Sequence, residues 1–323
     1  MENLVSVIIP AYNSGERIKS CVSSILQSTY TSIEIIVVDD GSSKTDADIY
    51  DGLKTLSEKI RIIHQENTGV SGARNTGIDC SHGEFITFVD ADDTIDSELI
   101  STLVCNLKKN KADVSECGYK EYFDKTNYLS VTCEKKKELV GSDILECFFT
   151  SNTIGWNVWG KVYKRSVIGE TRFKLGRRTA EDMFFIYEIL KKSKKIIVDE
   201  HLLYNYIKHS DSAMADTNCE KFFDTYDLIT EVYEDKLSNK KLKKAQLEFY
   251  MSKMLWFFRF IICKDKKNLY SEQIQSARVF FLENIKMSKI KYTKKQNIEL
   301  FLFKYAYSVY KILVLGVNHG RKI

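Results

Sequence analysis

The sequence predicts an α/β protein: a mostly parallel central sheet flanked by helices, followed by a helical region that extends to the C-terminus. Four short runs rich in β-branched apolar residues occur within the first ninety residues, and helical patterns separate them. Runs of this kind are typical of strands that are buried on both faces of a parallel sheet. From about residue 216 onward the pattern is helical throughout.

The four predicted strands cover residues 4–9, 33–38, 60–63 and 85–89. Apolar residues recur at helical spacing over 18–26, another helix is expected to begin near Ser43, and a shorter one covers 73–80. Because such an alternation forms right-handed crossovers, the carboxyl ends of the strands should meet at one edge of the sheet, where ligands of such folds bind.

The pattern becomes mixed beyond residue 110. Strands are expected at 112–117, 196–198 and 202–207, and helices at 142–150 and 181–190. The polar stretch 209–218 is the expected boundary, which gives a domain over 1–215 and a helical region over 216–323.

Composition excludes several classes of protein. Of the 323 residues, 44% are hydrophobic and 28% are charged, as in soluble globular proteins, and residues 1–9 are too short and too β-branched for a signal peptide. The eight cysteines form no C-x-x-C pair and no cluster with histidine, so we expect reduced thiols in a cytoplasmic protein and no zinc site. The absence of G-x-G-x-x-G and P-loop motifs argues against a dinucleotide dehydrogenase and an NTPase.

The net charge of +4 is distributed unevenly along the chain. Residues 1–235 hold 28 Lys+Arg against 39 Asp+Glu, whereas residues 236–323 hold 20 against 5. The basic C-terminal segment should therefore meet an anionic surface.

An acidic segment, Asp90-Ala91-Asp92-Asp93, directly follows the predicted strand 85–89. Three carboxylates so close together repel one another, so a positive group should lie among them. A hard divalent cation, Mn²⁺ or Mg²⁺, fits, because it takes oxygen ligands and keeps positions open for the phosphates of a substrate. The alternative is a solvated acidic loop. The polar segments 11–13 and 39–42 follow two other strands and should lie at the same edge.

Four segments of the chain resemble glycosyltransferase family 2. They are Val5-Ser-Val-Ile-Ile-Pro-Ala-Tyr-Asn13, Ile35-Ile-Val-Val-Asp-Asp-Gly-Ser42, Asn67-Thr-Gly-Val-Ser-Gly-Ala-Arg-Asn-Thr-Gly77 and Phe88-Val-Asp-Ala-Asp-Asp93. Each is weak alone, but their order and spacing together are specific. The resemblance continues less sharply through Trp159–Lys164 and Ala180–Phe185 and fades after about residue 212. It implies a GT-A fold, which is Rossmann-like, with a nucleotide-sugar half over 1–110 and an acceptor half over 111–215.

The resemblance implies that a UDP-sugar binds at the edge of the sheet. Tyr12 offers a flat face on which a pyrimidine can stack, or it is an ordinary loop aromatic. Asp40 would accept the imide N–H of uracil while Asp39 braces the turn, or both cap the following helix. Arg74 would pair with the diphosphate or with the acidic segment. The implied nucleotide-sugar residues are Pro10, Ala11, Tyr12, Asn13, Asp39, Asp40, Arg74, Asp90, Ala91 and Asp92.

The same resemblance assigns chemical roles to the carboxylates. Asp92 would bind the metal directly, and Asp90 would contact the ribose or a metal-bound water. Asp93 would support them or cap a helix before Ser97. Asp182 would be the general base, with Glu181 beside it, although carboxylates in a first helical turn also stabilise the helix dipole.

The acceptor side is expected from aromatic and basic residues. Trp156, Trp159 and Lys161 would line or support it, although tryptophan is more often a core residue. His209 would belong to a tail that folds over the diphosphate. Together with these residues, the resemblance implies an inverting, metal-dependent transfer of a hexose or N-acetylhexosamine from a UDP-sugar. The acceptor would be a hydroxyl of a growing bacterial surface glycan, free or lipid-linked, such as a capsular or exopolysaccharide repeat unit. The alternatives are a dTDP-sugar or teichoic-acid enzyme and a non-catalytic nucleotide-sugar-binding scaffold.

The C-terminal segment 297–315 is apolar apart from one narrow stripe, formed by Lys304, Ser308 and Lys311. Two charges make it a poor membrane span. It predicts an interfacial helix on an anionic membrane, with lysines at 240–244 and 286–295 and aromatic residues at 254–263 adding to the attraction. The protein would then be cytoplasmic and peripheral at the inner face of the plasma membrane. The alternative is packing on the catalytic domain or on a second subunit of a homo-oligomer. No nucleic-acid-binding module is recognisable.

Overall fold

The computed structural model describes residues 3–123, 127–132, 135–209, 219–265, 267–286 and 294–318. The chain divides into two compact units, Met1–Ala215 and Asp216–Ile323. Each unit is described below by itself.

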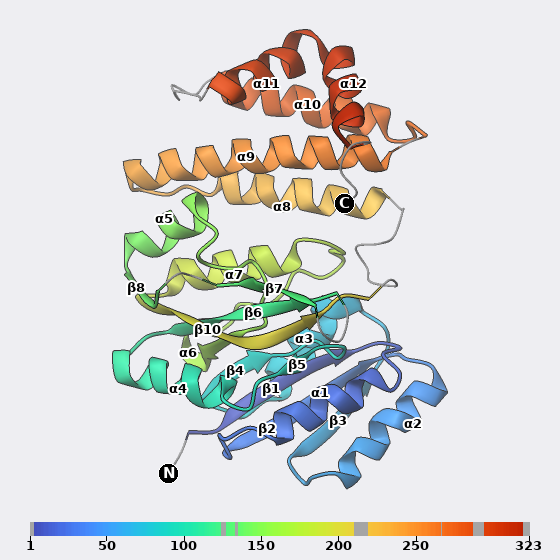
Figure 1. The fold of residues 1–323 in the computed structure, drawn as a ribbon, viewed down its shortest axis with the longest axis vertical. Coiled ribbons are helices and arrows are strands. Elements are labelled where there is room, and N and C mark those ends of the chain that lie inside the picture. Colours follow the sequence, from blue (N-terminus) through green and yellow to red (C-terminus); the bar gives the residue numbers. More distant parts are fainter. Residues whose placement is uncertain are drawn as a thin grey trace. The chain divides into compact units, whose positions relative to one another are not determined.

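The first unit contains one sheet with helices on both of its faces (Figure 1). The strand order is β3-β2-β1-β4-β9-β6-β10-β5, with β7 paired to β6 and β8 paired to β10. The strands are β1 Val5–Ala11, β2 Ile33–Asp40, β3 Ile60–Gln65, β4 Phe85–Phe88, β5 Thr94–Ile95, β6 Val114–Tyr122, β7 Tyr128–Val131, β8 Lys137–Val140, β9 Lys161–Lys164 and β10 Lys195–Ile207. The helices are α1 Arg17–Leu26, α2 Lys44–Gly52, α3 Gly69–Cys80, α4 Leu99–Asn110, α5 Ser142–Thr150, α6 Arg165–Ile168 and α7 Glu181–Lys192, and a 3₁₀ turn spans Leu53–Thr55.

The four strands predicted from apolar runs form the parallel half of the sheet. β1 pairs in parallel with β2 and β4, and β2 pairs in parallel with β3. Val5, Val7 and Ile9 of β1 pack with α1, α2 and α4 in the main hydrophobic core. Ile8 faces α3 instead, where a Cβ on Gly77 would lie 2.3 Å from Ile8 Cγ2. Helices therefore cover both faces of β1 and β2, which explains their long apolar runs. β3 lies at the edge of the sheet, is only partly buried and contains Arg61, His64 and Gln65.

The first strand, predicted over residues 4–9 and so to end before Pro10, continues through Pro10, which lies one residue before the end of β1. The pairing of β1 with β4 stops at Ile8, so only β2 still pairs with β1 at Pro10. A proline is tolerated where one side of its strand has no partner, since it lacks an N–H to donate.

The second half of the sheet is mixed. β9 is antiparallel to both β4 and β6, whereas β10 is parallel to β6. The two short strands predicted at 196–198 and 202–207 are one thirteen-residue strand, β10, whose register shifts between Val198 and Tyr204. A bulge of this kind bends a strand without ending it, and this bend lets β10 pair with β8 at one end and β5 at the other.

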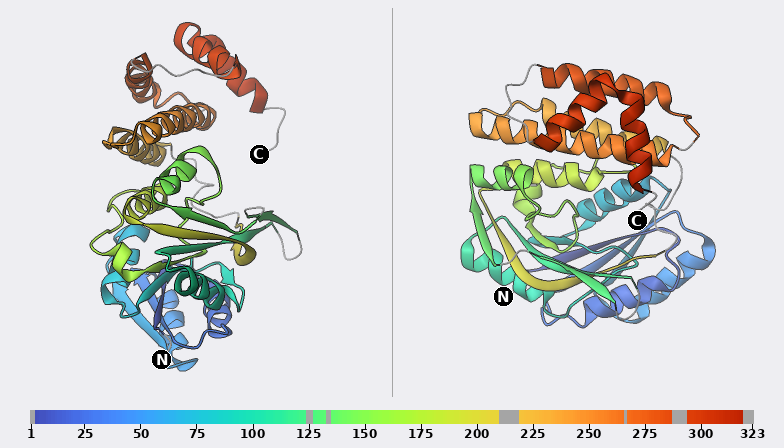
Figure 2. Two further views of the ribbon diagram at one scale, coloured as in Figure 1. Left: turned by 90° about the vertical axis from the view of Figure 1, so that its left-hand side faces the viewer. Right: turned by 45° about the horizontal axis from the view of Figure 1, so that its top comes forward.

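The second unit is helical in its described part. Its helices are α8 Phe223–Glu234, α9 Lys240–Lys264, α10 Ser271–Lys286, α11 Lys294–Tyr305 and α12 Tyr307–Asn318, preceded by a 3₁₀ turn over Glu220–Phe222. α8 lies beside α9, and α10 and α12 also contact α9 (Figure 2).

The single helix predicted over 297–315 is instead two helices that meet at Ala306. Of the residues at 254–263 that were predicted to help at a membrane, Met254, Phe257 and Phe258 are fully buried, whereas Trp256 is 41% exposed. The lysine-rich stretch 286–295 and the predicted boundary at 209–218 lie largely outside the described residues. None of the described helices combines the length and the apolar character needed to cross a lipid bilayer.

Candidate functional site

The predicted nucleotide segments lie at one edge of the sheet and are bonded to one another. Ala11 and Asp39 are paired across β1 and β2. In the loops that follow, the Asn13 N–H donates to Ser42 Oγ at 3.0 Å, and the Ser43 N–H donates to Asn13 Oδ1 at 2.8 Å. Asn13 adopts a φ of 48°, a left-handed conformation that asparagine tolerates. Tyr12 between these anchors is 57% exposed, so its ring is open to a ligand.

Asp39 and Asp40 are both buried, and their partners differ. Asp39 accepts from the Ser42 N–H at 3.0 Å and from His64 Nδ1 at 2.7 Å, so it braces the turn, as the sequence predicted. Its hydrogen bond raises the pKa of His64 above the ordinary value. Asp40 Oδ1 accepts from Gln65 Nε2 at 2.7 Å and from the Thr68 N–H at 2.9 Å. Protein donors thus fix Asp40 through this oxygen.

The loop between β2 and α2 lies against the segment that precedes α3. Gly41 has a φ of +75°, and a Cβ there would lie 2.9 Å from the backbone nitrogen of Asn67. Only glycine combines this conformation with this close approach. Gly41 therefore allows the segment 35–42 to lie against the segment 67–77, two of the four segments on which the family resemblance rests.

Within the acidic segment, Asp93 is a structural anchor. It is 1% exposed and accepts from the Tyr204 hydroxyl at 2.7 Å and from the Ile207 N–H at 2.8 Å. The prediction that Asp93 caps a helix is wrong, because its carboxylate bonds to β10 and the next helix begins only at Leu99. Burial and the nearby Asp90 raise the pKa of Asp93 well above its ordinary value.

Asp92 is the open carboxylate of the segment. Its side chain is 41% exposed, and His209 Nε2 lies 3.8 Å from Asp92 Oδ2. Burial and the Asp90 carboxylate raise the pKa of Asp92, so a cation beside it would be stabilising. Oxygen ligands with an accessible face suit Mn²⁺ or Mg²⁺, which commonly take one or two carboxylates together with substrate phosphates. Asp92 and Asp90 therefore fit a divalent cation.

Arg74 joins the acidic segment to the start of α7. Its guanidinium contacts Asp90 Oδ1 at 3.1 Å, Glu181 Oε1 at 3.3 Å and Asp182 Oδ1 at 2.5 Å. The side chain is 4% exposed, and Phe173 lies beneath it at 5.3 Å. Burial disfavours its charge, but Asp182 and Asp90 more than compensate and raise the pKa of Arg74. Four predicted site residues from three separate segments thus form one charge network.

Asp182 is largely buried at the start of α7. Arg74 holds one of its oxygens, and the Val158 N–H donates to the other at 3.3 Å. Burial raises the pKa of Asp182 to about 7, while Arg74 opposes the increase and Glu181 adds to it. A carboxylate with a pKa near neutrality is a suitable proton acceptor at neutral pH.

A buried ion pair supports the loop that reaches Asp182. Lys161 Nζ lies 3.1 Å from Glu116 Oε1 and donates to the Asn157 carbonyl at 2.6 Å, while Glu116 accepts from the Gly155 N–H at 2.7 Å. Lys161 is 1% exposed, so it does not line a surface but supports the loop. Glu116 could not be predicted from the sequence, because it lies in β6 among residues without a recognisable motif.

The two tryptophans differ in exposure. Trp159 is buried and stacks on Tyr204 at 4.3 Å and on Tyr206 at 5.6 Å. It therefore follows the core alternative, and it supports Tyr204, whose hydroxyl also accepts from the Asp90 N–H at 3.2 Å. Trp156 is only partly buried, and its ring lies 6.4 Å from that of Phe148.

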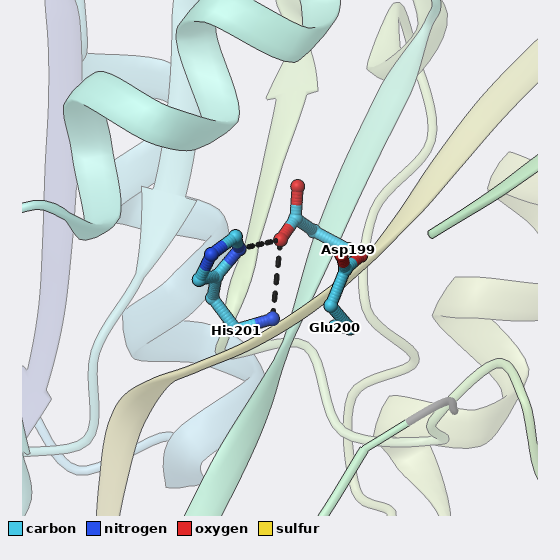
Figure 3. A group of neighbouring side chains, drawn as sticks. All are labelled: Asp199, Glu200 and His201. Atoms are coloured by element: carbon cyan, nitrogen blue, oxygen red, sulfur yellow. Dashed lines mark hydrogen bonds and ion pairs between the residues drawn. The ribbon is translucent and has the colours of Figure 1, made fainter. Parts of the chain in front are cut away.

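A second acidic group, Asp199, Glu200 and His201, lies at the bulge of β10 (Figure 3). Asp199 is 2% exposed and accepts from Asn106 Nδ2 at 2.8 Å and from both the ring and the backbone of His201. Although burial alone would raise the pKa of Asp199, these bonds lower it to about 2. Protein donors already occupy Asp199, so this group anchors the bulge to α4.

Known proteins resemble this chain over the region of the site. Residues 6–168 match the family described as Glycosyl transferase family 2. The glycosyltransferase GlyG of Streptococcus pneumoniae serotype 4 is 34% identical over 224 residues, which cover 66% of this chain and 74% of GlyG. The uncharacterized glycosyltransferase EpsJ of Bacillus subtilis is 32% identical over 214 residues, which cover 65% of this chain and 62% of EpsJ. The chain thus spans a little less than two thirds of EpsJ.

The fold of this chain is also similar to that of a solved structure. The crystal structure of residues 1–349 of S. aureus TarS in complex with UDP-GlcNAc aligns with a TM-score of 0.73, at 18% sequence identity. The alignment covers 98% of this chain and 92% of that chain. It confirms the predicted GT-A fold with a C-terminal helical region.

Proposed function

Because the chain belongs to glycosyltransferase family 2, we propose that it transfers a sugar from a UDP-sugar to a hydroxyl of a growing bacterial surface glycan, with inversion at the anomeric carbon. The observation that carries the proposal is the network in which Arg74 joins Asp90 to Asp182. It brings a donor-side carboxylate and a candidate base to the same guanidinium. The TarS complex with UDP-GlcNAc supports a UDP-sugar donor, and N-acetylglucosamine is one candidate for the sugar.

Asp182 would act as the general base. Its carboxylate takes the proton of the acceptor hydroxyl as that oxygen bonds to the anomeric carbon. The bond from the anomeric carbon to the diphosphate breaks on the opposite side, and its electron pair leaves with UDP. Entry and departure on opposite sides invert the configuration. A well-placed base contributes roughly 10²–10⁴-fold to the rate.

The donor would be held by the edge of the sheet. Tyr12 would stack on the uracil, and Asp40 would accept the imide N–H with the oxygen that Gln65 and Thr68 do not use. Asp92 and Asp90 would hold Mn²⁺ or Mg²⁺, which when bound neutralises charge on the departing diphosphate. His209, close to Asp92, would add a donor on the same side.

The acceptor would approach Asp182 from the side of Trp156. A glycan or a lipid-linked glycan offers both a hydroxyl and an apolar sugar face for an aromatic ring. We place the reaction in the cytoplasm, where nucleotide sugars are made.

The test is a transfer and hydrolysis assay with UDP-, dTDP-, GDP- and CMP-sugars, each with Mn²⁺, with Mg²⁺ and with a chelator. We expect turnover of a UDP-sugar that requires the cation. Turnover of a dTDP-sugar alone would replace the proposed donor. Binding of UDP without turnover of any donor would favour a scaffold and contradict the proposal.

A further inference from the structure

The two C-terminal helices expose large apolar side chains. On α11, Ile298, Phe301 and Tyr305 are 63%, 60% and 66% exposed. On α12, Val309 and Ile312 are 47% and 69% exposed. We call these five side chains the α11–α12 apolar face.

These side chains are not needed to pack the second unit. Phe303 is fully buried and lies 4.8 Å from the ring of Phe258 and 5.9 Å from that of Phe281. Tyr310 is also buried, and its ring lies 5.1 Å from Phe303. Each helix thus contributes a buried side chain to the packing of the unit. Large apolar side chains that stay exposed besides these are typical of an interaction surface.

The chain segment that carries this face is strongly basic. Residues 236–323 hold 20 Lys+Arg and 5 Asp+Glu. Three of the five acidic groups already have partners. Glu299 pairs with Arg259 at 2.9 Å, Glu248 lies 3.7 Å from Lys244, and Asp265 accepts from the N–H groups of Leu269 and Tyr270. A helix that combines exposed Phe, Ile and Tyr with basic surroundings is typical of one that lies in the headgroup region of an anionic bilayer.

We propose that the α11–α12 apolar face inserts into the interfacial region of an anionic lipid membrane. Charge decides between this occupant and a second copy of the chain, because two copies meeting here would bring two basic segments together and repel. A bilayer rich in anionic lipid both accepts the apolar side chains and attracts the lysines. None of the five side chains belongs to the candidate site, so the surface stands independently of the proposed reaction.

Vesicle binding of the full-length protein tests this surface. We expect co-sedimentation with phosphatidylcholine vesicles that contain about one third phosphatidylglycerol, weaker binding to pure phosphatidylcholine, and loss of binding at high salt. The double variant Phe301→Ser/Ile312→Ser should bind the anionic vesicles at least about tenfold more weakly. Leu269→Ser is the matched control, because Leu269 is 69% exposed and lies between α9 and α10.

Two further measurements distinguish a specific loss of membrane binding from a loss of folding or activity. Thermal unfolding followed by circular dichroism and donor hydrolysis should be the same for wild type and double variant, since only exposed side chains change. Absence of vesicle binding by the wild type, equal binding to both vesicle types, or undiminished binding by the double variant would each overturn the proposal. So would a wild-type dimer in light scattering that the double variant dissociates, because the face would then be an interface between copies.

Discussion

At the level of single residues, two opposing effects determine the pKa of Asp182. Burial disfavours its ionised form, whereas the Arg74 guanidinium at 2.5 Å favours it. The balance leaves the carboxyl with a pKa of about 7, so a large fraction is ionised at neutral pH and can still hold a proton once it accepts one. This behaviour suits a group that must accept a proton in one step and release it in another.

Replacing Asp182 by asparagine should lower turnover at least about a hundredfold, because the amide cannot accept the proton. The affinity for UDP should remain close to that of the wild type, since Asp92, Asp90 and Tyr12 are unchanged. Steady-state transfer kinetics and calorimetric UDP titration measure the two effects separately. Glu188→Gln is the control on the same helix, where Glu188 forms a surface pair with Lys191. A loss below tenfold would move the base to another residue.

The pH dependence of the reaction should follow Asp182. A general base works in its ionised form, so kcat/KM should rise with pH and level off above the pKa of about 7. The measurement is kcat/KM between about pH 5.5 and pH 9 at saturating cation. A profile that is flat across the acidic half of this range would show that no buried carboxyl of raised pKa acts as the base.

At the scale of elements, β9 and β6 support the site through one buried pair. Lys161 at the start of β9 and Glu116 in β6 are 1% and 9% exposed. Together they fix Asn157 and Gly155, and so the loop that presents the Val158 N–H to Asp182. Burial raises the pKa of Glu116, and Lys161 opposes that increase. Each partner therefore depends on the other.

Lys161→Met should lower the free energy of unfolding by about 3 kcal/mol, since it leaves Glu116 buried without its partner. Adding Glu116→Gln should recover most of that loss, because both charges are then gone and the amide oxygen can still accept from Gly155. Urea unfolding of the two single variants and the double variant measures the coupling. Single variants whose effects simply add would show that the pair does not support the loop.

The elements that the sequence predicted correctly are those with strong local patterns. The helix at 142–150 has the predicted bounds, and the four apolar runs are strands of one sheet. β9 was not predicted, because a strand with lysine at both ends has no apolar run. Its Lys161 is buried because it pairs with Glu116, a residue distant in the chain, and bonds to the Asn157 carbonyl. The break at Ala306 was also missed, since residues on both sides of it continue the same helical spacing.

The candidate site was predictable only in part. The acidic segment stands out because three carboxylates follow a strand directly. The contacts of Arg74 with Asp182 and of Asp93 with Tyr204 join residues more than one hundred positions apart. Spacing along the chain holds no information about such contacts, so the resemblance to a family had to supply the roles of Arg74 and Asp182. Neither a local sequence pattern nor the family resemblance indicated a role for Glu116.

At the level of the whole molecule, the two units differ both in charge and in the task that we propose for each. The unit that contains the candidate site is acidic overall, whereas the helical unit is basic and exposes an apolar face. An enzyme that uses a soluble nucleotide sugar and a membrane-borne acceptor needs both a donor site and a means of attachment. The two proposals therefore describe complementary tasks, although each can fail without the other.

The proposed reaction depends on a cation that the acidic segment at the edge of the sheet would hold and that would bind the donor diphosphate. Calorimetric titration of UDP into the protein, with and without Mn²⁺, tests it most directly, using wild type, Asp92→Ala and the control Glu98→Ala, an exposed carboxylate six residues further on. We predict binding that requires Mn²⁺ in the wild type and in Glu98→Ala and that disappears in Asp92→Ala. Equal UDP affinity without Mn²⁺, or undiminished Mn²⁺-dependent binding by Asp92→Ala, would show that the acidic segment does not hold the cation.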